Sequence, residues 1–206
     1  MTSPGIIVVL NGAPRSGKSS IAEKILFRRP DWVADGVDAD MAMTSRDQLP
    51  GIGLRPGGER PELEPVVAGR FDRLYRRVAR RCDEGGSVVV DVGHHDWYAK
   101  PLGTLWSAAR ILEGCRAWLV GVRCPVEVVM ERRGAARGST YVLAGEDGLV
   151  PEPVLRWESA VHDPGIYDLE VDTSRLSASD CADRILRHVD EHHPTAFQRI
   201  NDTPHP

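Results

Sequence analysis

The feature that most constrains this chain is a glycine-rich loop between an apolar run and a helical pattern. Within VVLNGAPRSGKSS, residues 12–19 match G-x-x-x-x-G-K-[ST] at every position. Gly12 and Gly17 permit backbone dihedrals that a side chain would forbid, so the loop can turn its N–H groups toward phosphate oxygens at the positive end of the following helix. The residues predicted to hold phosphate are Gly12, Ala13, Pro14, Arg15, Ser16, Gly17, Lys18, Ser19 and Ser20.

Three side chains in or near this loop predict a magnesium–nucleotide site. Lys18 supplies a cation near the β and γ phosphates, and Ser19 offers a hydroxyl to Mg²⁺. Asp91 ends the apolar run 88–90, at the sheet edge where open α/β sheets bind ligands. We therefore expect Ser19 and Asp91 near the metal, the alternative for Asp91 being a helix cap or a loop aspartate.

Apolar runs alternate with helical patterns along the chain, which predicts an α/β fold with a doubly wound, mainly parallel sheet. The expected strands are Gly5–Leu10, Trp32–Asp38, Ser87–Val92, Ala117–Cys124 and Tyr167–Thr173. The expected helices are Ser19–Arg29, Glu64–Asp83, Leu102–Glu113, Pro125–Ala135, Val154–His162 and Ser179–Glu191.

Two segments lack this periodicity. Thr44–Pro65 is rich in glycine and proline and is expected to be a loop that serves the acceptor, and Gly134–Pro153 is the second such segment. We expect one kinase-like domain over residues 1–193, with a mobile lid at about 132–162 and a frayed C-terminal segment over 194–206.

Composition and charge narrow the partners. A net charge of −4 argues against binding nucleic acid through a broad basic surface. The four cysteines show no C-x-x-C spacing, and the first apolar run is too short for a signal or a membrane span. We expect an intracellular, cytoplasmic protein with no nucleic-acid or membrane partner, and the oligomeric state stays open.

A phosphate-moving enzyme needs more than a phosphate loop, and the sequence offers candidates for each part. Asp38 ends the second expected strand and could accept the proton of a substrate hydroxyl, with Asp35 and Asp40 as lesser competitors. Arg133 and Arg137 lie four residues apart and, if helical, share one face toward a bound anion, although an ordinary basic helix end has the same pattern.

Other parts of the site are less specific. Gly134 and Gly138 would let the lid segment hinge. His94 and His95 lack a third metal ligand at convincing spacing, which favours loop or substrate-pocket roles. The chain has no N-K-x-D guanine-reading motif, and Asp172 and Thr173 lie where a base-contacting loop is expected, so the donor is ATP or GTP.

The segments NGAPRSGKSS, WVADGVDAD, VVVDVG, VGVRCPVEVVMERRGAARG and VHDPGIYDLEVDTS resemble, in the same order, the chloramphenicol phosphotransferase family. The resemblance covers Gly5 to about Val189 and implies a P-loop kinase that passes the ATP γ-phosphate to an antibiotic hydroxyl. It implies Asp38 as proton acceptor, Asp91 near the metal, Lys18 and Ser19 at phosphate and magnesium, and Arg133 and Arg137 in the lid.

The departures from that family lie on the acceptor side. Asp91 is followed by Val92 where the family leads us to expect paired acids, and the segment between Arg137 and His162 is longer. The acceptor is therefore left open as a chloramphenicol-like or other hydroxylated antibiotic, or a nucleoside, shikimate-like, sugar or nucleotide-sugar metabolite. A nucleotide-binding regulator without an acceptor is the alternative of a different class.

Overall fold

The computed structural model describes residues 4–37, 61–98, 100–135 and 149–204. Its centre is a five-stranded sheet in the order β2-β3-β1-β4-β5, and every neighbouring pair is parallel. The strands are β1 (Ile7–Asn11), β2 (Val33–Gly36), β3 (Val88–Val92), β4 (Ala117–Arg123) and β5 (Leu169–Asp172). The predicted α/β class and parallel sheet are thus confirmed.

Strand β1 lies in the middle of this sheet and its five residues are all buried. Ile7 is in register with Val88 on one side and with Ala117 on the other. Alternate side chains of β1 face opposite layers: Ile7 and Val9 join one apolar core, while Val8 and Leu10 join the other. A strand covered on both faces has no position for an exposed polar residue, which explains its continuous apolar run.

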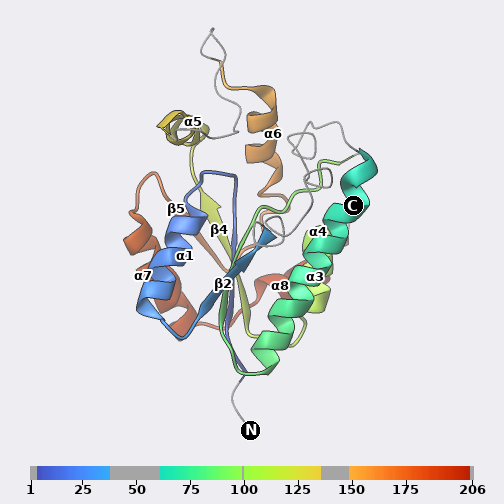
Figure 1. Cartoon of the computed structure of the whole chain (residues 1–206), viewed down its shortest axis with the longest axis vertical. Helices are drawn as coiled ribbons and strands as arrows, with labels where there is room; N and C mark the ends of the chain where they lie inside the picture. Colours follow the sequence, from blue (N-terminus) through green and yellow to red (C-terminus); the bar gives the residue numbers. More distant parts are fainter. Residues whose placement is uncertain (1–3, 38–60, 99, 136–148, 205–206) are drawn as a thin grey trace.

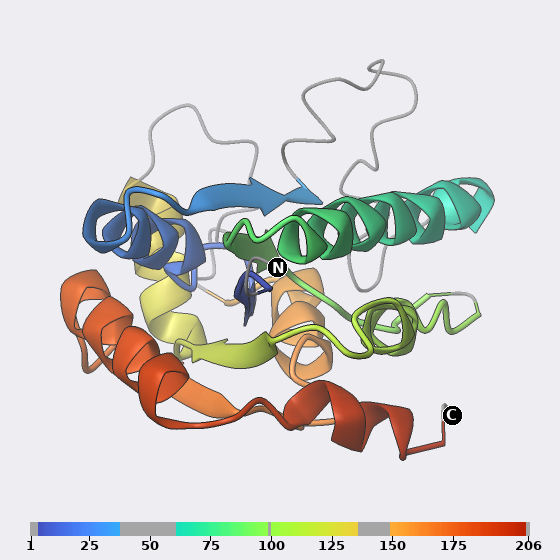
Figure 2. The same ribbon diagram turned by 90° about the horizontal axis from the view of Figure 1, so that it is seen from below.

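Helices cover both faces of the sheet. Figure 2 shows α1 (Lys18–Arg28) and α7 (Ala178–Glu191) on one side, and α3 (Glu64–Asp83), α4 (Thr104–Ile111) and α8 (Ala196–Asn201) on the other. Ser177 caps α7, since its hydroxyl accepts a hydrogen bond from the Asp180 amide at 3.1 Å. None of the helices within the described ranges is long and apolar enough to cross a membrane.

Two further helices stand apart from these layers. Figure 1 shows α5 (Val126–Ala135) and α6 (Glu152–Ala160) beyond the carboxyl ends of the strands. Strands β2 and β3 lie on one side of β1, and β4 and β5 lie on the other, so the strand order reverses at β1. Ligands of open α/β sheets bind in the crevice at such a point, and the functional site is expected there.

The C-terminal segment and the long loop differ in part from expectation. Residues after His193 were expected to be frayed, but 196–201 form α8, whose Ala196, Phe197 and Ile200 are buried against the core. The expectation failed because a helix this short buries its apolar side only through tertiary contacts. Residues 61–63 form the short 3₁₀ helix η3 (Pro61–Leu63) before α3, whereas 44–60 and 136–148 lie outside the described residues.

Candidate active site

The loop between β1 and α1 has the backbone that its glycines predict. Gly17 has φ 100° and Arg15 has φ 73°, both in the left-handed region. A Cβ at Gly12 would lie 2.5 Å from the carbonyl oxygen of Val122, so only glycine fits there. The Lys18 ammonium donates hydrogen bonds to the carbonyl oxygens of Gly12 at 2.9 Å and Ala13 at 3.0 Å. The loop therefore curls around its own cation.

Lys18, Ser19 and Asp91 meet beside this loop. The Ser19 hydroxyl donates a 2.6 Å hydrogen bond to Oδ2 of Asp91, and Lys18 Nζ lies 3.6 Å from Oδ1 of the same carboxylate. A hydroxyl and a carboxylate are hard oxygen ligands of the kind Mg²⁺ prefers, with phosphate and water oxygens completing its shell. Ser19 and Asp91 thus fit a magnesium ion that arrives with a nucleotide. Within the described ranges, no group of three or more His, Cys, Asp or Glu could hold a metal ion.

A second group of contacts braces the other side of the loop. The Thr173 hydroxyl donates to the Ser16 carbonyl oxygen at 2.6 Å and accepts from Arg132 at 3.0 Å. Arg132 also donates to the carbonyl oxygens of Thr173 at 2.8 Å and Arg15 at 3.3 Å. Asp172 is engaged elsewhere, because its carboxylate accepts from the amide and hydroxyl of Ser174, which holds the pKa of Asp172 below its usual range.

Arg132, which the sequence analysis did not single out, thus contacts the loop directly. Arg133 is 4% exposed on the same helix, and Arg137 lies outside the described residues. Successive helical residues point about 100° apart, so the sequence of a basic pair does not reveal which groups each member meets. The contact pattern with Thr173 became visible only in three dimensions.

Helix α6 brings the Glu158 carboxylate close to Lys18 and to two arginines. Burial raises the pKa of Glu158, against the opposing attraction of Arg123, Lys18 and Arg133. Its Oε2 is buried and has no hydrogen-bond partner in the described part of the chain. Its neighbour Trp157 lies close to Gly93 and to the loop. A Cβ atom added to Gly93 would be 3.5 Å from the Trp157 ring and 3.2 Å from the carbonyl oxygen of Gly12. This end of α6 thus lies over the phosphate loop.

The acidic candidates for proton acceptor fare differently. Asp38 and Asp40 lie outside the described residues. Asp35 is held by Arg77, whose Nε and Nη2 donate to its two oxygens at 2.7 and 2.8 Å, and it also accepts from the Gly36 amide at 2.8 Å. These contacts engage both carboxylate oxygens of Asp35 and tie β2 to α3.

The two adjacent histidines have separate environments. His94 is buried, with its ring nitrogens 2.6 Å from the Tyr75 hydroxyl and 2.9 Å from the Thr104 hydroxyl. Burial, followed by the nearby His95, lowers the pKa of His94 to about 3, so it is a neutral core residue. His95 packs against Tyr98 and Trp157, with ring centroids 4.4 and 5.0 Å away, which places it beside α6.

Asn11 connects three segments at the end of β1, and the sequence analysis missed it. Its Oδ1 accepts from the His94 amide at 2.8 Å, and its Nδ2 donates to the Val161 carbonyl oxygen at 2.7 Å and to the Tyr167 hydroxyl at 3.0 Å. The one available signal was a buried polar residue directly before Gly12 in an otherwise apolar strand. Asn11 fixes the segments that follow β3 and α6 to the phosphate loop.

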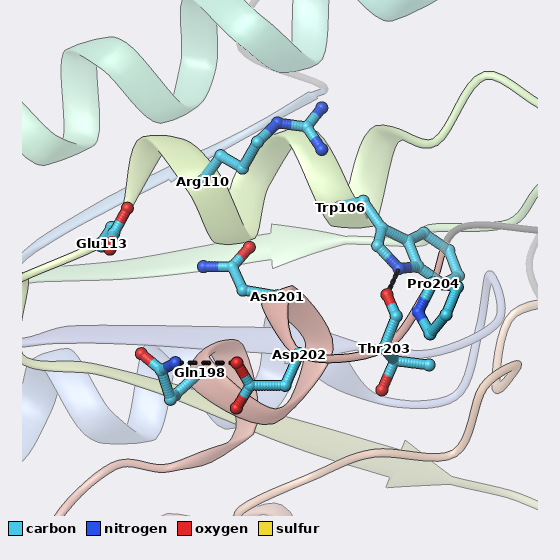
Figure 3. Close-up of a pocket in the computed structure, with 8 residues that line it drawn as sticks. All are labelled: Trp106, Arg110, Glu113, Gln198, Asn201, Asp202, Thr203 and Pro204. Carbon is cyan, nitrogen blue, oxygen red and sulfur yellow. Dashed lines mark hydrogen bonds between the residues drawn. The ribbon is translucent and has the colours of Figure 1, made fainter.

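A surface groove lies between α4 and α8, away from these residues. It has a volume of about 480 Å³, and Figure 3 shows its polar lining, including the hydrogen bond from Trp106 Nε1 to the Thr203 carbonyl oxygen at 3.2 Å. None of the residues predicted to bind phosphate or metal lines it. The lining is Trp106, Arg110, Glu113, Gln198, Asn201, Asp202, Thr203 and Pro204.

Comparisons with known proteins agree with this arrangement. The family described as "Chloramphenicol phosphotransferase-like protein" matches residues 5–190. Proteins from two strains of Mycobacterium tuberculosis, each named "Putative O-phosphotransferase", are 26% identical over 214 residues, covering 95% of this chain and 88% of theirs.

Solved structures show the same fold. An APS kinase of Mycobacterium tuberculosis, in complex with AMPPNP and APS, has a TM-score of 0.60 and 18% identity, covering 91% of this chain and 99% of its own. A shikimate kinase of Acinetobacter baumannii has a TM-score of 0.56 and 16% identity, covering 90% and 93%. A gluconokinase of Sinorhizobium meliloti has a TM-score of 0.55 and 18% identity, covering 99% and 100%.

Proposed function

This chain belongs to the chloramphenicol phosphotransferase-like family and is a phosphotransferase of the P-loop kinase type, and on that premise we propose that it moves the γ-phosphate of ATP to a hydroxyl of a small antibiotic. The observation that carries the proposal is the meeting of Ser19, Lys18 and Asp91 at the mouth of the loop. A hydroxyl, an ammonium and a carboxylate at these distances fit a site for the magnesium-bound phosphates of a nucleotide better than they fit a purely structural turn.

The proposed step is an in-line transfer. The acceptor oxygen forms a bond to the γ-phosphorus while the bond to the β–γ bridging oxygen breaks, and ADP leaves with that electron pair. The acceptor proton passes to a carboxylate, for which we propose Asp38, and Lys18 stabilises the charge on the phosphate oxygens. A magnesium ion held through Ser19 and Asp91 would neutralise the charge on the β and γ phosphates.

The acceptor is proposed from the family and from chemistry. The family is named for chloramphenicol phosphotransferase, and the relatives are named as O-phosphotransferases, so a hydroxylated antibiotic is the first acceptor to test. Phosphorylating such a drug inside the cytoplasm, where ATP is available, would protect the cell that makes the enzyme.

The direct test is susceptibility of cells that express the protein, followed by mass measurement of each drug recovered from the culture. We expect resistance to at least one hydroxylated antibiotic and recovery of its phosphate ester. Cells expressing the Lys18→Ala variant should stay sensitive. In a second experiment, sugars, nucleosides and nucleotide sugars are assayed as acceptors with labelled ATP. A phosphorylated product there, with no modified drug in the first experiment, would show that the acceptor is a metabolite and not an antibiotic.

A further inference from the structure

His162 lies directly after α6 and is only 7% exposed. Its Nδ1 is 2.7 Å from the Tyr167 hydroxyl. Its Nε2 is buried and has no hydrogen-bond partner among the residues described. A buried polar atom without a partner costs free energy, so this nitrogen needs an explanation that the described residues do not supply.

The hydrogen-bond network fixes which nitrogen of His162 carries the proton. Asn11 Oδ1 accepts from the His94 backbone amide, which can only donate, and Asn11 Nδ2 donates to the Val161 carbonyl oxygen, which can only accept. The amide orientation of Asn11 is therefore settled by two backbone groups.

Tyr167 transmits this orientation to the imidazole. Its oxygen accepts the second Asn11 amide proton at 3.0 Å. The Tyr167 proton is then available for His162 Nδ1, its other partner at 2.7 Å. A neutral ring that accepts at Nδ1 holds its own proton at Nε2. The partnerless atom is consequently an N–H donor.

Two cations, Arg123 and Lys18, lie near this donor, and the Glu158 carboxylate lies near the same two cations. Burial lowers the pKa of His162 to about 3, and the nearby charges of Arg123 and Lys18 lower it further in the same direction. The ring is thus neutral at physiological pH. Its position is tied to the phosphate loop, because Asn11 precedes Gly12 and bonds to Val161, the neighbour of His162, while Lys18 bonds to the Gly12 carbonyl oxygen.

We propose that the Nε2–H group of His162 donates a hydrogen bond to an oxygen of the terminal phosphoryl group of the bound nucleotide. A donor without a partner, close to two cations at the base of a phosphate loop, is complementary to an anionic oxygen rather than to a cation or an apolar group. Asn11 and Tyr167 are positioning residues for this donor. The inference rests on the proposed function only in requiring that the loop binds a nucleoside triphosphate.

Binding measurements with AMPPNP and ADP test the assignment without an acceptor. Hydrogen bonds to charged groups correspond to about a tenfold to a hundredfold change in affinity. We expect His162→Asn to lose AMPPNP affinity by that amount and to keep its ADP affinity within about twofold, since ADP lacks the terminal phosphoryl group. Equal losses for both nucleotides, or no loss for AMPPNP, would overturn the proposal.

The conservative variant identifies the nitrogen. The amide nitrogen of glutamine reaches the place of Nε2, whereas that of asparagine reaches only the place of Nδ1. We expect His162→Gln to recover most of the AMPPNP affinity that His162→Asn loses. If His162→Asn keeps the AMPPNP affinity and His162→Gln loses it, the donor is Nδ1 and the assignment to Nε2 is wrong. The matched control is His192→Gln on the exposed end of α7, which should bind both nucleotides like the unmodified protein.

Nitrogen NMR of the protein labelled at histidine provides a readout that does not depend on a variant folding well. We expect a neutral His162 with its proton on Nε2, whose Nε2 signal moves with AMPPNP and stays with ADP. Tyr167→Phe should mix the two tautomers and weaken AMPPNP binding in part. A proton found on Nδ1 in the unmodified protein would refute the assignment, even if phosphate transfer to a hydroxyl were demonstrated.

Discussion

The Ser19 hydroxyl and the Asp91 carboxylate are joined by a 2.6 Å hydrogen bond although 72 residues separate them in the sequence. The register of β1 with β3 brings them together, because it pairs Leu10 with Asp91 directly before the loop begins. In the proposed reaction both groups serve one magnesium ion, so their proximity links the parallel sheet to the chemistry.

The first prediction concerns Asp91. Asp91→Asn should lower turnover by about two to three powers of ten, because a lost metal site removes several kcal/mol of charge stabilisation. Turnover of the variant should also require more magnesium, which a titration of rate against Mg²⁺ would measure. Asp35→Asn is the matched control, since it removes a carboxylate from the neighbouring strand, where Arg77 holds it; an equal loss there would contradict a metal role for Asp91.

The second prediction concerns the brace formed by Thr173. Thr173→Val keeps the shape but deletes the donor to Ser16 and the acceptor for Arg132. We expect nucleotide affinity to fall about threefold to tenfold, as for the loss of one ordinary hydrogen bond. Calorimetric titration with AMPPNP measures it, and the exposed Arg175→Ala serves as control. Unchanged affinity would mean that the loop holds its shape without this contact.

The third prediction separates the two glycines that the structure treats differently. Gly12→Ala should abolish nucleotide binding, because the new Cβ would meet the Val122 carbonyl oxygen at 2.5 Å. Gly134→Ala meets nothing within 4 Å and should raise the free energy of unfolding by up to about 1 kcal/mol, since alanine favours a helix. If Gly134 acts as a hinge of the lid, turnover of Gly134→Ala should fall severalfold while its stability rises. Equal turnover of Gly134→Ala and the unmodified protein would show that Gly134 is not a hinge.

The fourth prediction is a loss of stability in acid. Burial lowers the pKa of His94 to about 3, of His95 to about 4 and of His162 to about 3, from the ordinary value of 6.5. The unfolded chain therefore binds protons that the folded chain excludes. The free energy of unfolding is therefore unaffected by protonation of these three histidines above pH 6.5 and falls as the pH drops toward about 4. The slope is up to about 1.4 kcal/mol per pH unit for each histidine.

Urea unfolding followed between pH 7 and 4 measures this slope. His94→Gln should make it shallower, because one of the three excluded protons is then absent. A flat free energy of unfolding across that window would show that the histidines are protonated in the folded protein as well.

Much of the fold followed from periodicity. The three inner strands, β1, β3 and β4, are buried and have apolar runs, and all five strands were found within a few residues of their expected bounds. The apolar stripe of α3 predicted Glu64–Asp83 as observed. Short α8 was missed because tertiary packing against α4 and β4 stabilises it. The phosphate loop was readable because its chemistry is local in sequence.

The remaining site residues act over long separations. Asn11 and Val161 are 150 residues apart, and Arg132 and Thr173 are 41 apart. Nothing in the residues themselves specifies which partner each will meet. The rotation of α5 that selects Arg132 depends on how the helix packs, and the neutral state of His94 depends on a core that forms only when α3 and α4 assemble.

The measurement that tests the central claim most directly is acceptor-dependent phosphate transfer by the Asp38→Asn variant, with AMPPNP affinity measured on the same preparation. With the acceptor identified from the susceptibility screen, we predict transfer reduced by about two to four powers of ten at nearly unchanged nucleotide affinity. Transfer at the rate of the unmodified protein would contradict the account, because the proton would then leave the acceptor by another route.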